Sequence, residues 1–367
     1  MKLLLLVIAS LLSLSALGEE ADTSRSDNIK RFNESQRCHK SAIAEGHKKK
    51  AVRCAQSSLE VGENLFEPDS KNIAGLTYNY GSALLSRGYD SGKRIQKVLS
   101  EALRLYESLY GENSLELVDL LLDLGHANNL STNTTGVKRS SYSSALEILA
   151  SNYGNSSLEY AEAQLAISIE ILGRARTSGQ LSFSNKHAKG ALEIFLQELG
   201  PTSVGATLAS FQLGKQKMLR EKYRSAIPFL NNALANPSVA QYAHGFLIRA
   251  YEETGQRASA GFHAQELGKL VSGQEDQNYI PVYVPQPDYP RKAQVKGVSG
   301  YAVIELTISV EGTAIKTSIV EQYPTSKGFG KAALKAAKKL RYVPRFVDGE
   351  AVEVPGVLYK FTFKMAR

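Results

Sequence analysis

Tryptophan is absent from the 367-residue chain, and cysteine and methionine occur only two and three times. Also missing are the short motifs of common catalytic sites, namely H-E-x-x-H, G-x-S-x-G, G-x-x-x-x-G-K-[ST] and a G-x-G-x-x-G that follows a strand. The six histidines are scattered between His39 and His263. We therefore expect no enzymatic activity, no cofactor, no metal site and no small-molecule substrate.

Long apolar runs are missing as well, except at the N-terminus. Residues 3–17 are mostly apolar, and the small residues Ala16 and Gly18 lie just before Glu19. This pattern predicts a cleaved signal peptide over residues 1–18, because the run is shorter than the roughly 20 residues that a spanning helix prefers. The alternative is an uncleaved membrane anchor. Either way, we expect an exported protein.

Basic residues outnumber acidic residues mainly in the last part of the chain. The formal net charge is +8, and residues 279–367, with 14 Lys/Arg and 7 Asp/Glu, carry +7 of it. An acidic partner would therefore be bound by this part. Nucleic acid is not expected, because an exported protein meets little of it and the basic residues lack the interleaved aromatic side chains of single-strand binders.

The two cysteines, Cys38 and Cys54, are 16 residues apart, and Gly46 lies midway, where a helical hairpin can turn. In an oxidising compartment an isolated pair usually forms a disulfide, and we predict one here. The alternatives are free thiols or a metal site that also uses His39 and His47, although this spacing matches none of the usual zinc patterns.

Similar segments recur along the first two thirds of the chain. Four of them end at Glu67, Gly111, Gly154 and Gly200, at spacings of 43 to 46 residues, and another apolar helical pattern follows each. Apolar residues at i, i+3, i+4 and i+7 predict amphipathic helices, and the glycines stand where helices should end. Because one helix pair cannot bury its apolar face alone, stacked pairs are expected.

The unit over residues 213–237 has the most diagnostic pattern. It consists of Leu213, Gly214, Tyr223, Ala226, Ala233 and Pro237. The small residues would let two helices approach closely, and the pattern resembles the tetratricopeptide repeat. The resemblance implies an all-α solenoid of about five to six helix pairs over residues 19–271. Such a solenoid is a scaffold whose groove can hold a peptide or a protein segment.

The period of the apolar pattern changes after a polar stretch, residues 272–278, which we interpret as a linker. Ala302, Ile304, Leu306 and Ile308 share one face of a strand. The turn at Glu311-Gly312 leads to a second strand around residues 314–320, and residues 357–363 alternate again. A helix over residues 329–340 lies between them. The order strand, strand, helix, strand predicts a small α+β domain with an antiparallel sheet.

The predicted helix carries four lysines within nine residues, a pattern that could also suit a nucleic-acid or membrane surface. On a helical projection its apolar residues form one stripe and its lysines another. The first stripe is Phe329, Ala333, Ala336, Ala337 and Leu340, and the second is Lys331, Lys335, Lys338 and Lys339. We expect the first stripe to pack on the sheet and the lysines to face water.

A set of landmarks runs in order through the same region. They are Gln286-Pro287-x-Tyr289-Pro290-x-x-Ala293, Gly297-x-x-Gly300, Glu311-Gly312, Ala332-Ala333-Leu334 and Arg341-Tyr342-x-Pro344. Together they resemble the C-terminal domain of TonB energy transducers. The family usually has tryptophan where this chain has Leu340, which can fill the same core position. We therefore expect a TonB C-terminal-like domain over residues 279–367.

The resemblance implies a periplasmic domain that grips outer-membrane receptors, with a short receptor segment added as an extra strand at the edge of the sheet. It assigns partner binding to two groups of residues. They are Gln286, Pro287, Tyr289 and Pro290, and Gly356, Val357, Leu358, Tyr359, Lys360 and Phe361. The alternative for Tyr289 and Pro290 is a structural role where the chain joins the domain.

TonB transducers also carry a membrane helix and a long proline-rich spacer, whereas the sequence here predicts a signal peptide and a solenoid instead. We therefore expect a periplasmic adaptor for protein–protein interaction in TonB-dependent transport, with TonB-system components or outer-membrane receptors as partners. The alternatives are an envelope module that binds peptidoglycan through its basic domain, and an N-terminally anchored transducer in the inner membrane that faces the periplasm.

Overall fold

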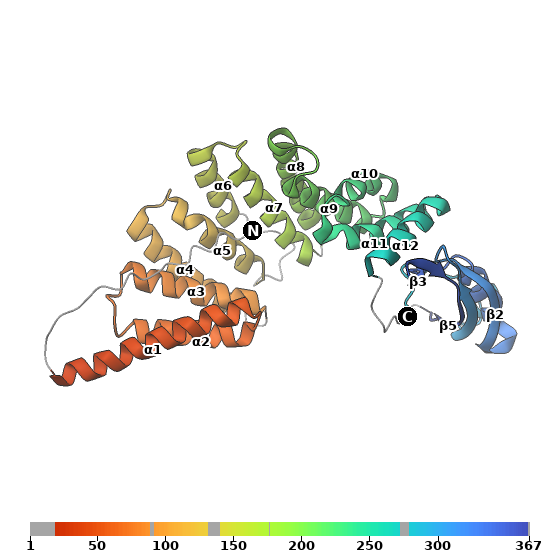
Figure 1. Ribbon diagram of the computed structural model, residues 1–367, viewed down its shortest axis with the longest axis horizontal. Coiled ribbons are helices and arrows are strands. Elements are labelled where there is room, and N and C mark those ends of the chain that lie inside the picture. Colours follow the sequence, from red (N-terminus) through yellow and green to blue (C-terminus); the bar gives the residue numbers. More distant parts are fainter. Residues whose placement is uncertain (1–18, 89–91, 131–139, 176, 272–278, 366–367) are drawn as a thin grey trace. The chain divides into compact units, whose positions relative to one another are not determined.

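A computed structural model gives the fold of the chain (Figure 1). It describes residues 19–88, 92–130, 140–175, 177–271 and 279–365. The predicted signal peptide and the predicted linker lie outside these ranges. The chain divides into two compact units, residues 1–194 and 195–367. None of the helices in the described ranges combines the length and the apolar character that a bilayer crossing requires.

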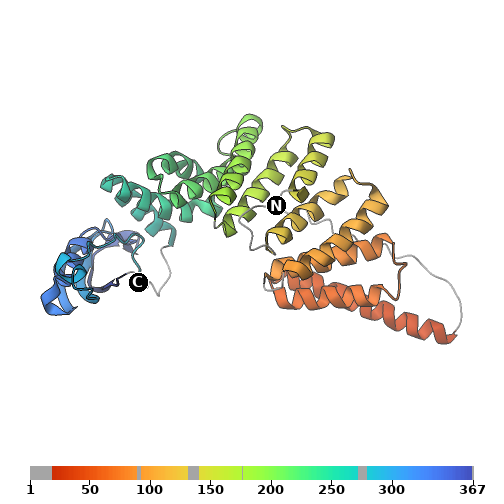
Figure 2. The ribbon, with the colours of Figure 1, turned by 180° about the vertical axis from the view of Figure 1, so that it is seen from behind.

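The first unit consists of helices that reverse direction at each connection, and each helix packs against the next (Figures 1 and 2). They are α1 (Glu19–Ala44), α2 (Lys48–Gly62), α3 (Lys71–Arg87), α4 (Gly92–Tyr110), α5 (Val118–Leu130), α6 (Ser140–Tyr153), α7 (Leu158–Arg174) and α8 (Ser178–Leu199), with a 3-10 turn (Leu115–Leu117) before α5. The last residues of α8 belong to the second unit. Gly111 and Gly154 adopt positive φ angles directly after α4 and α6, which confirms that these glycines end helices.

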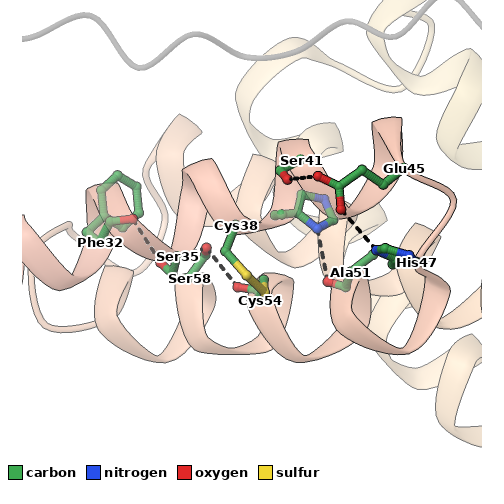
Figure 3. Close-up of a disulfide and its surroundings, with 10 residues drawn as sticks. Phe32, Ser35, Cys38, Ser41, Glu45, His47, Ala51, Cys54 and Ser58 are labelled. Carbon is green, nitrogen blue, oxygen red and sulfur yellow. Dashed lines mark hydrogen bonds and ion pairs between the residues drawn. A yellow bond between two sulfur atoms is a disulfide. The ribbon is translucent and has the colours of Figure 1, made fainter.

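The predicted disulfide is present and joins α1 to α2 (Figure 3). Gly46 turns the chain between the two helices with a φ of 71°, as expected for a residue without a side chain. His39 lies one residue after Cys38, and its Nδ1 is 3.0 Å from the backbone oxygen of Ala51. Burial lowers the pKa of His39, so the imidazole is neutral and Nδ1–H donates to that oxygen. The disulfide and this hydrogen bond therefore both join α1 to α2.

Reduction of this disulfide is expected to lower the stability of the α1–α2 hairpin by about 3 kcal/mol, the value typical of a loop of this length. Amide hydrogen exchange of α1 and α2, with and without dithiothreitol, measures the change. The variant Cys38→Ser/Cys54→Ser is the control, because it should exchange as fast as the reduced protein and ignore the reductant. Equal protection in the oxidised and reduced protein would contradict the prediction.

The second unit begins with two further helix pairs. They are α9 (Val204–Leu219) with α10 (Tyr223–Ala233), and α11 (Pro237–Glu253) with α12 (Arg257–Val271). A Cβ added to Gly214 would lie only 2.6 Å from Cδ2 of Leu230, and Ala226 is fully buried. The close approach of α9 and α10 expected from these small residues is confirmed.

The C-terminal domain follows in the same unit. Its elements are α13 (Arg291–Gln294), β1 (Gly300–Ile308), β2 (Ala314–Tyr323), a 3-10 turn (Thr325–Lys327), α14 (Phe329–Ala337), β3 (Arg345–Val347), β4 (Glu350–Val352) and β5 (Val354–Phe363). The main sheet is antiparallel in the order β2-β1-β5, and β3 pairs only with β4 among the described strands. The predicted order of strand, strand, helix and strand is confirmed. The β3–β4 hairpin was missed, because three-residue strands show too little alternation.

Helix α14 packs against β1 and β2 and closes the core of this domain. All five residues of its predicted apolar stripe are buried, and so is the matching face of β1. The lysines of α14 and of the turn after it are exposed, so they form a solvated face, as predicted. The helix ends at Ala337 rather than at residue 340, because Arg341 already pairs with Tyr283 and Thr313 in β-bridges. The predicted fold class, a helical solenoid followed by a small α+β domain, is confirmed.

Candidate functional site

The closing strand β5 forms one edge of the main sheet. Its residues pair with β1 from Gly300↔Phe363 to Ile308↔Val354, and no described strand pairs with its other side. An edge strand offers unpaired N–H and C=O groups to a further strand. The six predicted residues from Gly356 to Phe361 all lie on this strand, so the sheet does supply the open edge that strand addition requires.

The two faces of β5 differ. Val357 and Phe361 point into the core and are buried. Tyr359 packs against the same core, and burial raises the pKa of its phenol, which therefore stays protonated and neutral. Leu358, with 60% of its surface exposed, and Lys360 lie on the opposite face. A strand that joined β5 would therefore meet an anchored, preformed partner with one exposed apolar side chain.

A bulge limits the length of the open edge, and Lys360 on its outward face contacts the neighbouring strand. Gly356 has a φ of 74° and lies where the register with β1 shifts, which is typical of a bulge. The Lys360 ammonium lies over the ring of Tyr301, 3.9 Å from its centroid, and the Tyr301 hydroxyl donates to Glu321 on β2. The regular ladder after the bulge thus runs from Val357 to Phe363, and it is long enough for a short added strand.

The other predicted group, between Gln286 and Pro290, contacts β5 through Tyr289. The Tyr289 ring packs edge-to-face on Phe329 and Phe363, with centroids 6.0 and 5.9 Å away. Its hydroxyl donates to the backbone oxygen of Val298 at 2.9 Å. Pro290 is the N-cap of α13, Gln286 is exposed and Pro287 is half-buried. The structure thus gives Tyr289 and Pro290 structural contacts, and among these four residues it exposes only Gln286 fully.

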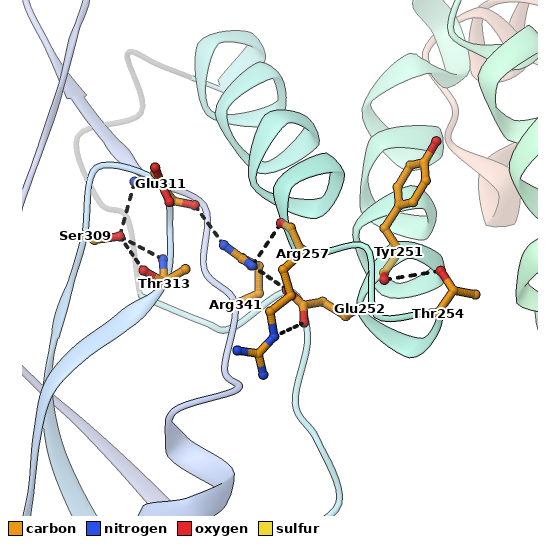
Figure 4. A network of polar contacts seen from close by, with 8 residues as sticks. All are labelled: Tyr251, Glu252, Thr254, Arg257, Ser309, Glu311, Thr313 and Arg341. Atoms are coloured by element: carbon orange, nitrogen blue, oxygen red, sulfur yellow. Dashed lines mark hydrogen bonds and ion pairs between the residues drawn. The ribbon is translucent and has the colours of Figure 1, made fainter.

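Sequence reasoning missed the role of Arg341, a landmark residue that is buried (Figure 4). Its Nε donates to Oε1 of Glu252 at 2.9 Å, and a second nitrogen, Nη2, also donates to this oxygen. Further hydrogen bonds reach the backbone oxygens of Arg257 and Glu311 at 3.3 Å. Glu252 lies in the last turn of α11 and Arg341 follows α14, so the ion pair joins the last helices of the repeat region to the C-terminal domain. Nothing in the sequence marked Glu252 as its partner.

Apolar packing surrounds this ion pair. Ile248, Ala264 and Leu267 of the last helix pair form a cluster with Val282, Tyr283 and Val343 of the C-terminal domain. A Cβ on Gly268 would lie 2.6 Å from the ring of Phe346 on β3, so α12 and the β3–β4 hairpin touch closely. The C-terminal domain therefore packs on α11 and α12.

In the described ranges, no three His, Cys, Asp or Glu side chains come together as a metal site. The C-terminal domain instead offers backbone hydrogen-bonding groups at an open strand edge, one exposed apolar side chain and a basic surface.

Known proteins resemble the two parts of the chain separately. The model of the family described as Gram-negative bacterial TonB protein C-terminal matches residues 285–365. Protein TonB of Pseudomonas aeruginosa is 32% identical over 98 residues, which are 26% of this chain and 28% of that protein. The chain therefore spans less than a third of this curated relative. The resemblance inferred from the ordered landmarks is confirmed.

Solved structures follow the same division. The solution structure of the Pseudomonas aeruginosa TonB CTD is 29% identical, with a TM-score of 0.22, and the match covers 25% of this chain and 92% of that one. A crystal structure of TPR-like repeats from a putative kinesin light chain of Podosopora anserina is 10% identical, with a TM-score of 0.45. This match covers 57% of this chain and 95% of that one.

Proposed function

We propose that this protein is a periplasmic adaptor that joins protein partners in TonB-dependent transport across the outer membrane. One partner segment adds to β5 as a further strand, and the helical repeats bind a second protein. The observation that carries the proposal is an open edge strand inside the region that matches the TonB C-terminal family. The lack of catalytic motifs supports a binding role without catalysis.

The physical basis of the grip is backbone pairing. An added strand gains a ladder of main-chain hydrogen bonds, and specificity comes from side chains on alternate positions. Leu358 is exposed between Val357 and Tyr359, which the core holds in place. It is therefore the residue of β5 best placed to contact a side chain of the added strand.

Photo-crosslinking from Leu358 tests the proposal. With p-benzoylphenylalanine at this position, we expect the protein to crosslink to a purified TonB-dependent outer-membrane receptor. Val320 is the matched control, because it lies on β2, at the opposite edge of the sheet, and has a similar exposure of 56%. The variant Leu358→Ala should raise the Kd up to about fivefold through the lost cross-strand contact, whereas Val320→Ala should not.

Crosslinks of equal yield from Leu358 and Val320 would contradict strand addition at β5. Recovery of purified peptidoglycan instead of the receptor, with binding reduced by salt, would favour the envelope-binding alternative. Both substitutions are at exposed positions, so unchanged circular dichroism should show that the fold is intact.

A further inference from the structure

A cleft of about 510 Å³ lies where the last helix pair meets the C-terminal domain. It is formed by α12, by the turn between β1 and β2, and by the segment after α14. Its lining includes Arg257, Phe262, Gln265, Thr313, Lys338 and Lys339. This volume falls within the range of sites that bind small ligands or short peptides, and the cleft does not include β5.

Two buried side chains that form an ion pair lie at the bottom of the cleft. Glu252 and Arg341 line it, and each side chain is only 4% exposed. Their ion pair is tied to the backbone of both neighbours through the oxygens of Arg257 and Glu311 (Figure 4). The Gln265 amide also reaches the backbone oxygen of Val310 across the junction, at 3.4 Å. The cleft therefore belongs to a packed interface.

The charge of the cleft is positive once this ion pair is set aside. Arg257 lies 3.9 Å from the far oxygen of Glu252 and is mostly exposed. Lys338 and Lys339 are exposed, and neither has an ion-pair partner in the described part of the chain. Glu311 is the only remaining carboxylate among the lining residues. Three cations against one anion favour an acidic ligand.

The walls add apolar and polar groups that could orient such a ligand. Phe262 is 56% exposed, so its ring offers an accessible apolar surface at the wall of the cleft. Gln265 and Thr313 provide hydrogen-bonding groups. An aromatic wall beside exposed cations suits a peptide that carries carboxylates and an apolar side chain.

We propose that this cleft binds a short acidic peptide segment of a partner protein. The carboxylates of the segment pair with Lys338, Lys339 and Arg257, and an apolar side chain packs on Phe262. The site is independent of strand addition at β5, and its position ties ligand binding to the junction between the repeats and the C-terminal domain.

Calorimetric titration of the full chain with two synthetic peptides tests the proposal. The peptide acetyl-Glu-Leu-Glu-Glu-amide should bind at least about tenfold more tightly than acetyl-Gln-Leu-Gln-Gln-amide, because three charge pairs are lost in the second. The variant Lys338→Gln/Lys339→Gln should raise the Kd of the acidic peptide about fivefold, and Phe262→Ala should raise it to a similar extent. All three side chains are exposed, so these variants should fold normally.

The control variant is Lys292→Gln/Lys296→Gln, which removes the same charge from exposed positions on and just after α13 and should leave the Kd unchanged. An equal loss in both double variants would overturn the proposal, since it would show attraction by net charge alone. Equal affinity for the Glu and Gln peptides would overturn it as well. So would saturation by inorganic phosphate or binding to phosphatidylglycerol vesicles that displaces the peptide, because the ligand would then be a phosphate group.

Discussion

The variant Glu252→Leu is expected to lower the free energy of unfolding of the second unit by about 3–5 kcal/mol. Both side chains of the Glu252–Arg341 pair are almost fully buried, so the substitution leaves the Arg341 guanidinium buried without its counter-charge, with only the backbone oxygens of Arg257 and Glu311 as acceptors among the described residues. Removing one member of a buried ion pair costs much more than the pair contributes. Urea unfolding followed by circular dichroism measures the loss, which suits a chain without tryptophan.

A double-mutant cycle separates this effect from a general loss of packing. In Glu252→Leu/Arg341→Met both charges are gone, and we expect more than half of the lost stability to return. The exposed pair Lys335–Asp288, at 2.7 Å, provides the control, because Asp288→Asn should change stability by less than about 1 kcal/mol. If the stability losses of Glu252→Leu and Arg341→Met add up to the loss in the double variant, the ion pair does not stabilise the junction.

Acidification is expected to weaken the α11–α12 pair. His244 and His263 are buried between these helices, and their Nδ1 atoms are 2.9 Å apart. Burial and the neighbouring His244 lower the pKa of His263 to about 4, and burial also lowers the pKa of His244. Between pH 6.5 and 4 the unfolded chain thus binds a proton that folded His263 does not. The free energy of unfolding is therefore highest above pH 6.5, and we expect it to fall by roughly 3 kcal/mol as the pH drops to 4.

Hydrogen exchange of α11 and α12 across this pH range measures the loss. The variant His263→Asn removes the titrating group and should flatten the pH dependence, although it lowers stability at neutral pH. His47→Asn removes an exposed histidine and should leave the slope unchanged. A slope in His263→Asn that equals that of the unsubstituted protein would assign the pH dependence to other groups.

Local periodicity predicted most of the fold. The strand face from Ala302 to Ile308 and the apolar stripe of α14 could be assigned, because a side chain's place on a strand or helix depends only on its spacing along the chain. The Cys38–Cys54 bond was predictable for another reason, because an isolated cysteine pair in an exported protein usually forms a disulfide and Gly46 allows a turn between the two residues. The β3–β4 hairpin was not, because strands of three residues show too little alternation to be recognised.

The candidate sites also differ in whether local spacing along the chain was enough to predict them. Local patterns along the chain were enough to predict the helical repeats, the order of strands and helix in the C-terminal domain, and the residues that resemble TonB. The three-dimensional arrangement was needed to show that β5 is an edge strand, that Glu252 is the partner of Arg341, and that Phe262, Lys338 and Lys339 line one cleft. The physical reason is that an open edge, a buried ion pair and a cleft arise where segments far apart in the chain meet, and periodicity carries no information about such meetings.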